Sequence, residues 1–120
     1  MVAKIEFYPN EKELTLPLIT LTKSINGKTG TATFLFLKPN IFEKIYLISL
    51  PIQKMSLIFD KKEIITEDIS IFFLKGKPII LKSILLFKNS TEWFEFFNFM
   101  KIYSKETGLI FEEKKNKNIL

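Results

Sequence analysis

The longest helical pattern of apolar residues in the chain runs from Asn89 to Gly108. Its large side chains recur every three or four residues, which places them on one face of a helix of about four turns: Trp93, Phe96, Phe97, Met100 and Tyr103. Asn89 and Glu92 have the spacing of a capping box, in which each side chain accepts from an unpaired amide of the first turn. Gly108 can adopt the left-handed conformation that ends many helices. We therefore predict one helix that buries its aromatic face against a sheet.

Short runs with the alternation of β-strands, separated by turn residues, precede this helix. Asn26 and Gly27 both tolerate the positive φ of a type I′ turn, so they predict an antiparallel hairpin between residues 14–23 and 29–37. Pro17 has no amide donor, which places the first of these strands at the edge of a sheet. In the second strand three apolar side chains share one face and predict a buried side: Ala32, Phe34 and Phe36.

The other apolar runs predict strands in residues 3–8, 52–59, 64–74 and 79–87. Glu67 interrupts the third of these runs, where we expect the strand to twist outward or to bulge. Residues 38–51 permit two structures. Asn40 and Glu43 have the capping-box spacing of a short helix, whereas the β-branched and aromatic content also suits an irregular apolar loop. The helix would carry three isoleucines on one face: Ile41, Ile45 and Ile48.

The predicted fold class is α+β, with an antiparallel β meander sheet packed by one C-terminal α-helix and a short two-stranded accessory pairing of the termini. Residues 109–111 supply the C-terminal strand of that pairing. Because 120 residues suffice for one core of ordinary size, we expect residues 1–112 to form a single domain. Residues 113–120 are expected to be a mobile charged tail.

No targeting or membrane-spanning segment is predicted. Met1 is followed directly by a strand pattern, which leaves no room for a signal peptide or a transit segment. The most apolar runs, at residues 45–52 and 83–87, are shorter than the ~18 residues that a spanning helix needs. We therefore expect a soluble or peripheral protein that works in the compartment where it is made.

The absence of cysteine and histidine removes most catalytic and metal-binding chemistry. Without cysteine there are no disulfides or thiolate nucleophiles, and without histidine there is no imidazole for proton transfer near neutral pH. The carboxylate pairs Glu67-Asp68 and Glu112-Glu113 are sequence neighbours, whose side chains point to opposite sides of a strand. We therefore predict that the protein is not an enzyme and holds no metal or other cofactor.

The net charge is +5, and all 18 basic residues are lysine. Lysine attracts phosphate or carboxylate as a point charge, but it lacks the bidentate fork with which arginine contacts guanine. The sequence has no aromatic RNA-binding motif and no basic stripe along a helix. A protein partner is therefore favoured, and a basic nucleic-acid-binding module is the alternative. Heavy use of Lys, Ile, Phe and Asn without Arg is typical of A+T-rich genomes, including many organelle genomes.

A glycine-containing hairpin and a tryptophan-bearing helix form the most specific combination of motifs in the chain. The hairpin is Asn26-Gly27-Lys28-Thr29-Gly30-Thr31-Ala32, and the helix contains Glu92-Trp93 and Phe99-Met100 with Tyr103. Further matching stretches, in the same order and spacing, are residues 3–7, 21–24, 63–66, 76–78 and 108–109. Together these segments resemble the photosystem II thirteen-kilodalton protein family, also called the Psb-twenty-eight family of assembly factors.

The resemblance implies a small α+β protein without a cofactor that catalyses no reaction. Such a protein binds transiently to photosystem II assembly intermediates at the stromal or cytoplasmic face, near the large inner-antenna chlorophyll protein and the reaction-centre loops. The resemblance also implies a peripheral position on the plastid thylakoid membrane, held through contacts with photosystem II subunits and without nucleic acid. We expect the protein to be monomeric when it is free.

Lysines at the strand turns are the first candidates for partner binding. In a meander, alternate turns lie at the same end of the sheet, so four lysines should share one end: Lys23, Lys28, Lys61 and Lys62. Lys75 and Lys77 should lie at the other end. Ordinary solvated turns explain these lysines equally well.

The last strand before the helix, residues 78–88, provides the second group of candidates. It would be an edge of the meander, with no proline inside the run after its first residue. We therefore predict that a partner segment docks along it by strand addition. Three apolar and two basic side chains would make the contacts: Ile80, Ile84, Leu86, Lys82 and Lys88. The two lysines fit equally well as guards of the edge against aggregation.

Overall fold

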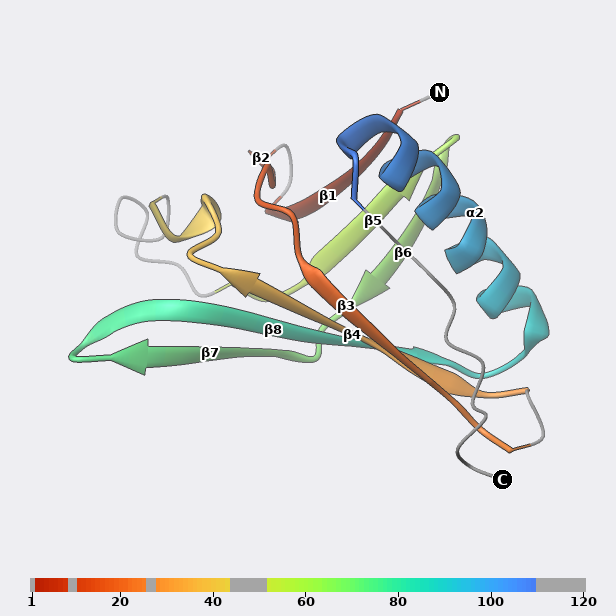
Figure 1. Ribbon diagram of the computed structural model, residues 1–120, viewed down its shortest axis with the longest axis horizontal. Coiled ribbons are helices and arrows are strands. Elements are labelled where there is room, and N and C mark those ends of the chain that lie inside the picture. The colour runs from red at the N-terminus through yellow and green to blue at the C-terminus, as the bar shows by residue number, and fades with distance from the viewer. Residues whose placement is uncertain (1, 9–10, 26–27, 44–51, 110–120) are drawn as a thin grey trace.

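The computed structural model describes residues 2–8, 11–25, 28–43 and 52–109, and Figure 1 shows how they are arranged. Within these residues the chain forms eight strands followed by one long helix. The elements are β1 (Ala3–Tyr8), β2 (Glu11–Lys12), β3 (Leu18–Lys23), β4 (Gly30–Leu37), β5 (Met55–Phe59), β6 (Lys62–Thr66), β7 (Ile69–Leu74), β8 (Lys77–Phe87) and α2 (Ser90–Thr107). The predicted α+β class is confirmed.

The strands form two four-stranded antiparallel sheets, and not the single meander that we predicted from the sequence. The first sheet has the strand order β2-β1-β5-β6, and the second has the order β3-β4-β8-β7. A meander requires consecutive strands to be neighbours. The consecutive strands β6 and β7 lie in different sheets, so the predicted arrangement is wrong.

The chain passes from the first sheet to the second at Glu67 and Asp68, inside the run predicted as one strand. The Thr66 hydroxyl donates to the carbonyl oxygen of Ile84 at 2.6 Å and accepts from the amide of Asp68 at 3.1 Å. The amide of Ile84 donates in turn to the carbonyl oxygen of Asp68 at 3.0 Å. These bonds fix a corner between the sheets, so Glu67 marks the end of a strand and not a bulge within one.

The predicted hairpin of β3 and β4 is confirmed, because the two strands pair antiparallel along the whole of β3. Its turn residues Asn26 and Gly27 lie outside the described residues. β3 is an edge strand of its sheet, as Pro17 predicted. β4 pairs on its other side with β8 along its full length, so the two longest strands form the middle of the second sheet.

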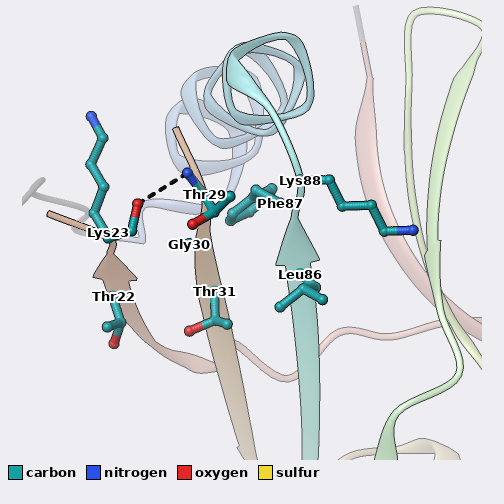
Figure 2. A pocket seen from close by; sticks show the side chains of 9 residues that line it. Thr22, Lys23, Thr29, Gly30, Thr31, Leu86, Phe87 and Lys88 are labelled. Carbon is teal, nitrogen blue, oxygen red and sulfur yellow. Dashed lines mark hydrogen bonds between the residues drawn. The ribbon is translucent and has the colours of Figure 1, made fainter. Parts of the chain in front are cut away.

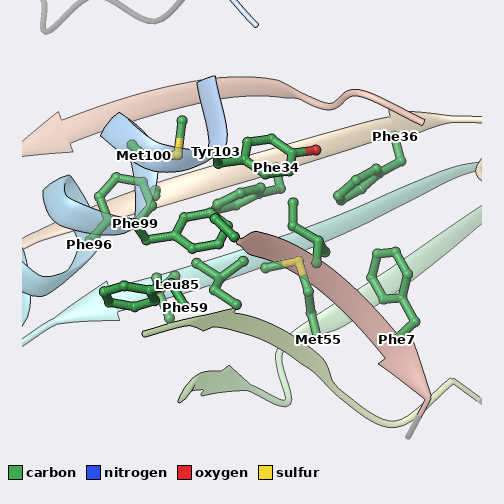
Figure 3. Close-up of a cluster of buried hydrophobic side chains, with 14 of the residues drawn as sticks. Phe7, Phe34, Phe36, Met55, Phe59, Leu85, Phe96, Phe99, Met100 and Tyr103 are labelled. Atoms are coloured by element: carbon green, nitrogen blue, oxygen red, sulfur yellow. The ribbon is translucent and has the colours of Figure 1, made fainter. Parts of the chain in front are cut away.

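The hydrophobic core lies between the inner faces of the two sheets and the helix α2 (Figure 3). Three side chains on the inner face of β4 are completely buried, as the alternation predicted: Ala32, Phe34 and Phe36. The ring of Phe96 in α2 meets Phe34 of the second sheet edge-on, with 6.1 Å between the ring centres. The ring of Phe99 meets Phe59 of the first sheet at 5.6 Å. The helix therefore joins the two sheets through its aromatic side chains.

The buried face of α2 matches the prediction with one exchange. Five of its side chains are buried: Trp93, Phe96, Phe99, Met100 and Tyr103. Phe97 was predicted on this face but is only half-buried, packed at the margin of the core. Phe99, which the spacing argument left out, is completely buried.

The two predicted ends of α2 are present. The side chain of Asn89 accepts a hydrogen bond from the amide of Glu92 at 2.9 Å. The Glu92 carboxylate accepts from the amide of Lys88 at 2.6 Å and not from that of Asn89, so the return bond of the capping box is displaced by one residue. Gly108 has a φ of 81°, and its amide donates to the carbonyl oxygen of Ser104 at 2.9 Å.

Parts of the predicted organisation fall on residues that the structure does not describe. Residues 41–43 are helical, whereas residues 44–51 with the rest of the predicted helix or loop lie outside the described residues. Leu109 is not in a strand. The other two residues of that predicted strand, 110–111, and the predicted tail 113–120 lie outside the described residues. Among the residues that are described, no helix is long and apolar enough to cross a membrane.

Candidate protein-docking surface

Strand β8 lies between two other strands, so the premise that it is a sheet edge, on which the predicted docking by strand addition rested, is wrong. Its backbone pairs with β4 on one side and with β7 on the other. Because β7 pairs with residues 77–83 of β8, and Ile84 is bonded to Asp68 and Thr66, a guest strand has no ladder to join along residues 77–84. The edge strands of this sheet, in the part of the chain that is described, are β3 and β7.

The second sheet has an outer face, turned away from the core, that we define by its register. Since Ala32, Phe34 and Phe36 point inward, the alternate residues and their cross-strand partners point outward. The outer face consists of Leu18, Thr20 and Thr22 of β3, Thr31, Thr33, Leu35 and Leu37 of β4, Ile80, Lys82, Ile84 and Leu86 of β8, and Ser70 and Phe72 of β7.

Large apolar side chains on this outer face are exposed. Leu18 is 66% exposed, Leu37 is 63% and Leu86 is 60%. The exposed Leu18 pairs across the strands with Leu35, and Leu37 pairs with Ile80, so the apolar surface continues from strand to strand. These exposures show that no described element covers the outer face. An apolar sheet face of this kind is typical of an interaction surface.

A shallow hollow of about 380 Å³ lies at one end of the outer face, next to the β3–β4 hairpin (Figure 2). Thr22, Thr31 and Leu86 form one cross-strand row along it. Figure 2 shows Lys23 near the Thr22 end of this row and Lys88 near the Leu86 end. The hollow therefore combines an apolar and hydroxyl-bearing floor with a positively charged margin.

Gly30 sets the close approach of β3 and β4 beside the hollow. A Cβ atom at this position would lie 2.6 Å from the carbonyl oxygen of Thr22. Real Cβ atoms do not approach backbone oxygen so closely, because the repulsion would force the strands apart. The glycine of the hairpin motif is therefore required by this strand pairing.

The helix holds Lys23 at the same end of the sheet. The Lys23 ammonium lies 5.2 Å from the centre of the Trp93 ring, where the negative face of the ring attracts a cation. The Trp93 ring is itself fixed edge-on against Phe87, with 4.8 Å between the ring centres. Lys23 thus covers the end of the core and also contributes positive charge beside the hollow.

The structure brings together some of the predicted site residues and separates others. Four lie on the outer face of β8, and Lys88 follows directly at the end of that strand: Ile80, Lys82, Ile84 and Leu86. Lys23 and Lys28 lie at the β3–β4 hairpin beside the hollow, and the register places Lys75 and Lys77 at the opposite end of the sheet, as predicted.

The other two lysines predicted at the hairpin end, Lys61 and Lys62, lie in the first sheet. Both are at the turn between β5 and β6. The expectation that they share an end with Lys23 rested on a meander, which the chain does not form. Their grouping with the hairpin lysines therefore loses its structural basis.

Sequence reasoning missed the part of the outer face that lies outside β8. Leu35 and Leu37 alternate in phase with Thr31 and Thr33, so both faces of β4 carry apolar side chains. This double pattern was a usable signal, since a strand with one solvated face usually shows polar residues there. The contribution of Phe72 depends on the pairing of β7 with β8, which the sequence pattern does not encode.

The buried titratable groups belong to the core and not to the outer face. Burial raises the pKa of Tyr103 to about 12, and the negative charge of Glu13 adds to this rise. Glu13 is itself buried, and its carboxylate accepts from three backbone amides: Thr15, Asn40 and Ile41. The described residues contain no group of three or more acidic, histidine or cysteine side chains that could hold a metal ion.

These features define a small α+β protein of two antiparallel sheets and one long helix. Its candidate site is a sheet face that none of the described elements covers. The sequence profile of the family described as Psb28 protein matches residues 5–111. The chain therefore belongs to the Psb28 family, and the family resemblance found in the sequence is confirmed.

Curated relatives match over nearly the whole chain. The photosystem II reaction center Psb28 protein of Prochlorococcus marinus (strain MIT 9215) is 39% identical over 113 residues, which are 94% of this chain and 95% of that protein. The protein of the same name from Trieres chinensis is 40% identical over 111 residues, covering 92% of this chain and 96% of its own length. The one from Pyropia yezoensis is 34% identical over 110 residues, with coverage of 92% and 96%.

Proposed function

We propose that this protein is a non-catalytic assembly or repair factor that binds transiently to assembly intermediates of photosystem II. Relatives of nearly the same length carry the name of the photosystem II reaction center, which supports a partner in that complex. The observation that carries the proposal is the outer face of the second sheet, which no described element covers and where Leu18, Leu37 and Leu86 are exposed. Its alternation of apolar and hydroxyl side chains suits a protein surface better than the phosphate backbone of a nucleic acid.

The proposed position is the stromal face of the plastid thylakoid membrane, with contacts to the inner-antenna chlorophyll protein and the reaction-centre loops. The family resemblance supports this position, and the arginine-free composition fits an organelle genome. The protein is held there through protein contacts as a peripheral factor. No cofactor is needed for this role, since binding alone performs it.

The outer face supplies the chemistry for such binding. Its apolar side chains lose contact with water on docking, which is the main favourable term in protein association. Lys82 lies between Leu35 and Ser70 in its cross-strand row, and Lys88 lies at the margin of the hollow. These lysines favour an acidic segment of the partner and increase the association rate by electrostatic attraction.

Affinity capture from detergent-solubilised thylakoid membranes, with mass spectrometry of the co-purifying proteins, tests the proposal. The wild-type protein is expected to retain photosystem II subunits, and nuclease treatment is expected to leave their recovery unchanged. Nuclease-sensitive recovery of nucleic acid without photosystem II subunits would support the nucleic-acid-binding alternative and overturn the proposal.

A pair of variants locates the contact. Leu86→Glu places a charge at the β8 end of the cross-strand row that lines the hollow. It should abolish capture, because the carboxylate would have to be desolvated at the interface. Phe94→Glu makes the same kind of change at a side chain of α2 that is 66% exposed and not part of the outer face, and it should retain capture. Equal capture by both variants would move the docking surface away from the outer face.

A further inference from the structure

The hairpin formed by β7 and β8 projects from the body of the protein at the end opposite to the hollow. Figure 1 shows its turn at one extreme of the long axis, beyond the first sheet. Three consecutive large apolar residues precede this turn, and all are exposed: Phe72 (49%), Phe73 (62%) and Leu74 (62%). Consecutive side chains of a strand point to opposite faces, so apolar surface surrounds the hairpin and does not form a single stripe.

β8 contains a bulge close to this turn. Phe72 pairs with Ile80 but Phe73 pairs with Pro78, so Ile79 is the extra residue of the longer strand. The carbonyl oxygen of Ile79 is not left without a partner, because it accepts from the amide of Lys38 at 2.7 Å. The residue that follows β4 is therefore hydrogen-bonded to the base of the projecting hairpin.

The turn itself is tight. Lys75 has a φ of 52° and Gly76 a φ of 79°, and two successive positive φ values are the requirement of a type I′ turn. Such a turn matches the twist of the two strands and gives a short, defined tip. We call Phe72, Phe73, Leu74, Lys75, Gly76 and Lys77 the hairpin tip.

The charge around the hairpin tip has one sign. Lys75 and Lys77 flank the turn, and Lys38 is joined to the base through its amide. No acidic residue occurs in the sequence between Asp68 and Glu92. Within the β7–β8 hairpin, the tip therefore combines exposed aromatic and aliphatic side chains with lysines and no acidic residue.

We infer that the hairpin tip inserts into the interface of an anionic lipid bilayer. Phenylalanine and leucine side chains partition into the boundary between headgroups and acyl chains, while lysines remain at the level of the anionic headgroups. A groove on a protein would cover one face of the hairpin, whereas a bilayer interface surrounds a projecting tip on every side. The hairpin tip would take a different class of partner from the proposed photosystem II contact. It shares Phe72 with the outer face, but its other residues lie outside that face, and its test with lipid vesicles does not depend on photosystem II.

Sedimentation with lipid vesicles tests the inference on the full-length protein. The protein should bind vesicles of three parts phosphatidylcholine to one part phosphatidylglycerol, bind vesicles of phosphatidylcholine alone much more weakly, and be released as salt rises. Phe73→Ser combined with Leu74→Ser should weaken binding to the anionic vesicles by about tenfold or more. The matched control, Phe94→Ser combined with Ile65→Ser, also removes two exposed apolar side chains and should bind like the wild type.

The lysines are tested in the same assay. Lys75→Gln and Lys77→Gln should each weaken binding to the anionic vesicles by about fivefold, the effect of one basic residue near an anionic surface. Lys61→Gln combined with Lys62→Gln removes two lysines from the turn between β5 and β6, and it should bind like the wild type. Equal loss from both turns would show that only net charge matters and would overturn the assignment to the hairpin tip.

Tryptophan quenching distinguishes insertion from adsorption. Trp93 is the only tryptophan and is buried in the core, so brominated acyl chains should not quench the wild-type fluorescence. Phe73→Trp should be quenched by brominated anionic vesicles, whereas the control Phe94→Trp should not. Quenching of both variants, or of neither, would contradict insertion through the tip.

Two further outcomes would overturn the inference. One is the absence of binding to either kind of vesicle by a wild-type protein that still captures photosystem II subunits in detergent, which leaves the proposed function intact. The other is a combined Phe73→Ser and Leu74→Ser variant that loses this capture but keeps vesicle binding, which would make the tip a protein contact.

Discussion

The buried carboxylate of Glu13 accepts a hydrogen bond at 3.0 Å from the backbone amide of Ile41, 28 residues further along the chain. The same carboxylate accepts from the amide of Asn40 at 2.8 Å. These amides lie at the start of the helical residues 41–43, where backbone donors lack partners within the helix and negative charge is favourable. One side chain therefore ties the segment before β3 to the segment after β4.

Replacing Glu13 with Gln should lower the free energy of unfolding by about 1–3 kcal/mol, because one backbone donor would face an amide group and the charge-assisted bonds would be lost. Urea unfolding followed by tryptophan fluorescence measures this change. Glu63→Gln alters an exposed carboxylate on β6 and should stay within ~0.5 kcal/mol of the wild type. An unchanged free energy for Glu13→Gln would contradict the role assigned to the buried carboxylate.

Trp93→Ala should lower the free energy of unfolding by about 3–5 kcal/mol, a large part of the ~5–15 kcal/mol available to a domain. The Trp93 side chain is only 7% exposed, and its ring packs at 4.8 Å against both Phe87 and Phe97. Thermal unfolding followed by circular dichroism measures the loss. The neighbouring change Phe94→Ala, at an exposed position, should have a small effect. A variant Trp93→Ala with the wild-type thermal midpoint would show that α2 does not pack as described.

The elements that the sequence predicted correctly are those set by local signals. The edge position of β3 follows from Pro17, and the end of α2 follows from Gly108, which needs no distant partner to adopt a positive φ. Alternation along β4 was enough to predict its buried side, because burial of alternate residues is a property of one strand. The same alternation placed the candidate residues of β8 on one face, while their role in partner binding stays a prediction.

The order of the strands depends on contacts between distant residues, and this part could not be predicted. Thr66, Glu67 and Asp68 interrupt the apolar run through residues 64–74 at the corner. The bond from the Thr66 hydroxyl to Ile84 that fixes the corner depends on a distant residue, so the pattern does not show that the chain changes sheets there. Without that corner, β8 resembles the last edge of a meander. The sequence pattern does not predict the burial of Glu13 either, because a glutamate in a polar run is typical of a solvated turn.

Gly30→Ala should lower the free energy of unfolding by about 1–3 kcal/mol, because the added methyl group would meet the carbonyl oxygen of Thr22 at 2.6 Å and push β3 away from β4. Urea unfolding measures this cost. Gly76→Ala is the matched control for the glycine substitution: its Cβ atom would meet nothing within 4 Å, but its φ of 79° leaves a conformational cost of about 1 kcal/mol. If Gly30→Ala were no more costly than this control, close strand contact would not explain the glycine.

The phenol of Tyr103 makes stability depend on alkaline pH. Burial, with a contribution from Glu13, raises the pKa of Tyr103 from 10.0 to about 12 in the folded protein. The folded state therefore holds this proton more tightly than the unfolded state, so the stabilisation is complete below about pH 10 and is lost as the pH rises through about 12. The difference in unfolding free energy between wild type and Tyr103→Phe, measured across this range, isolates the effect from the titrating lysines. A difference that does not change with pH would contradict it.

Capture of photosystem II subunits should weaken as salt rises, because contacts of exposed lysines are screened over about 8 Å at physiological ionic strength. Lys82 and Lys88 are the outer-face and hollow-margin lysines that can be changed without touching the Trp93 packing. Lys82→Gln combined with Lys88→Gln should capture less than the wild type at low salt and should show a smaller decrease on adding potassium chloride. Lys61→Gln combined with Lys62→Gln serves as the control with equal charge change in the other sheet. If that control loses capture while the outer-face variant retains it, the contact belongs to the turn between β5 and β6, and the outer face is not the docking surface.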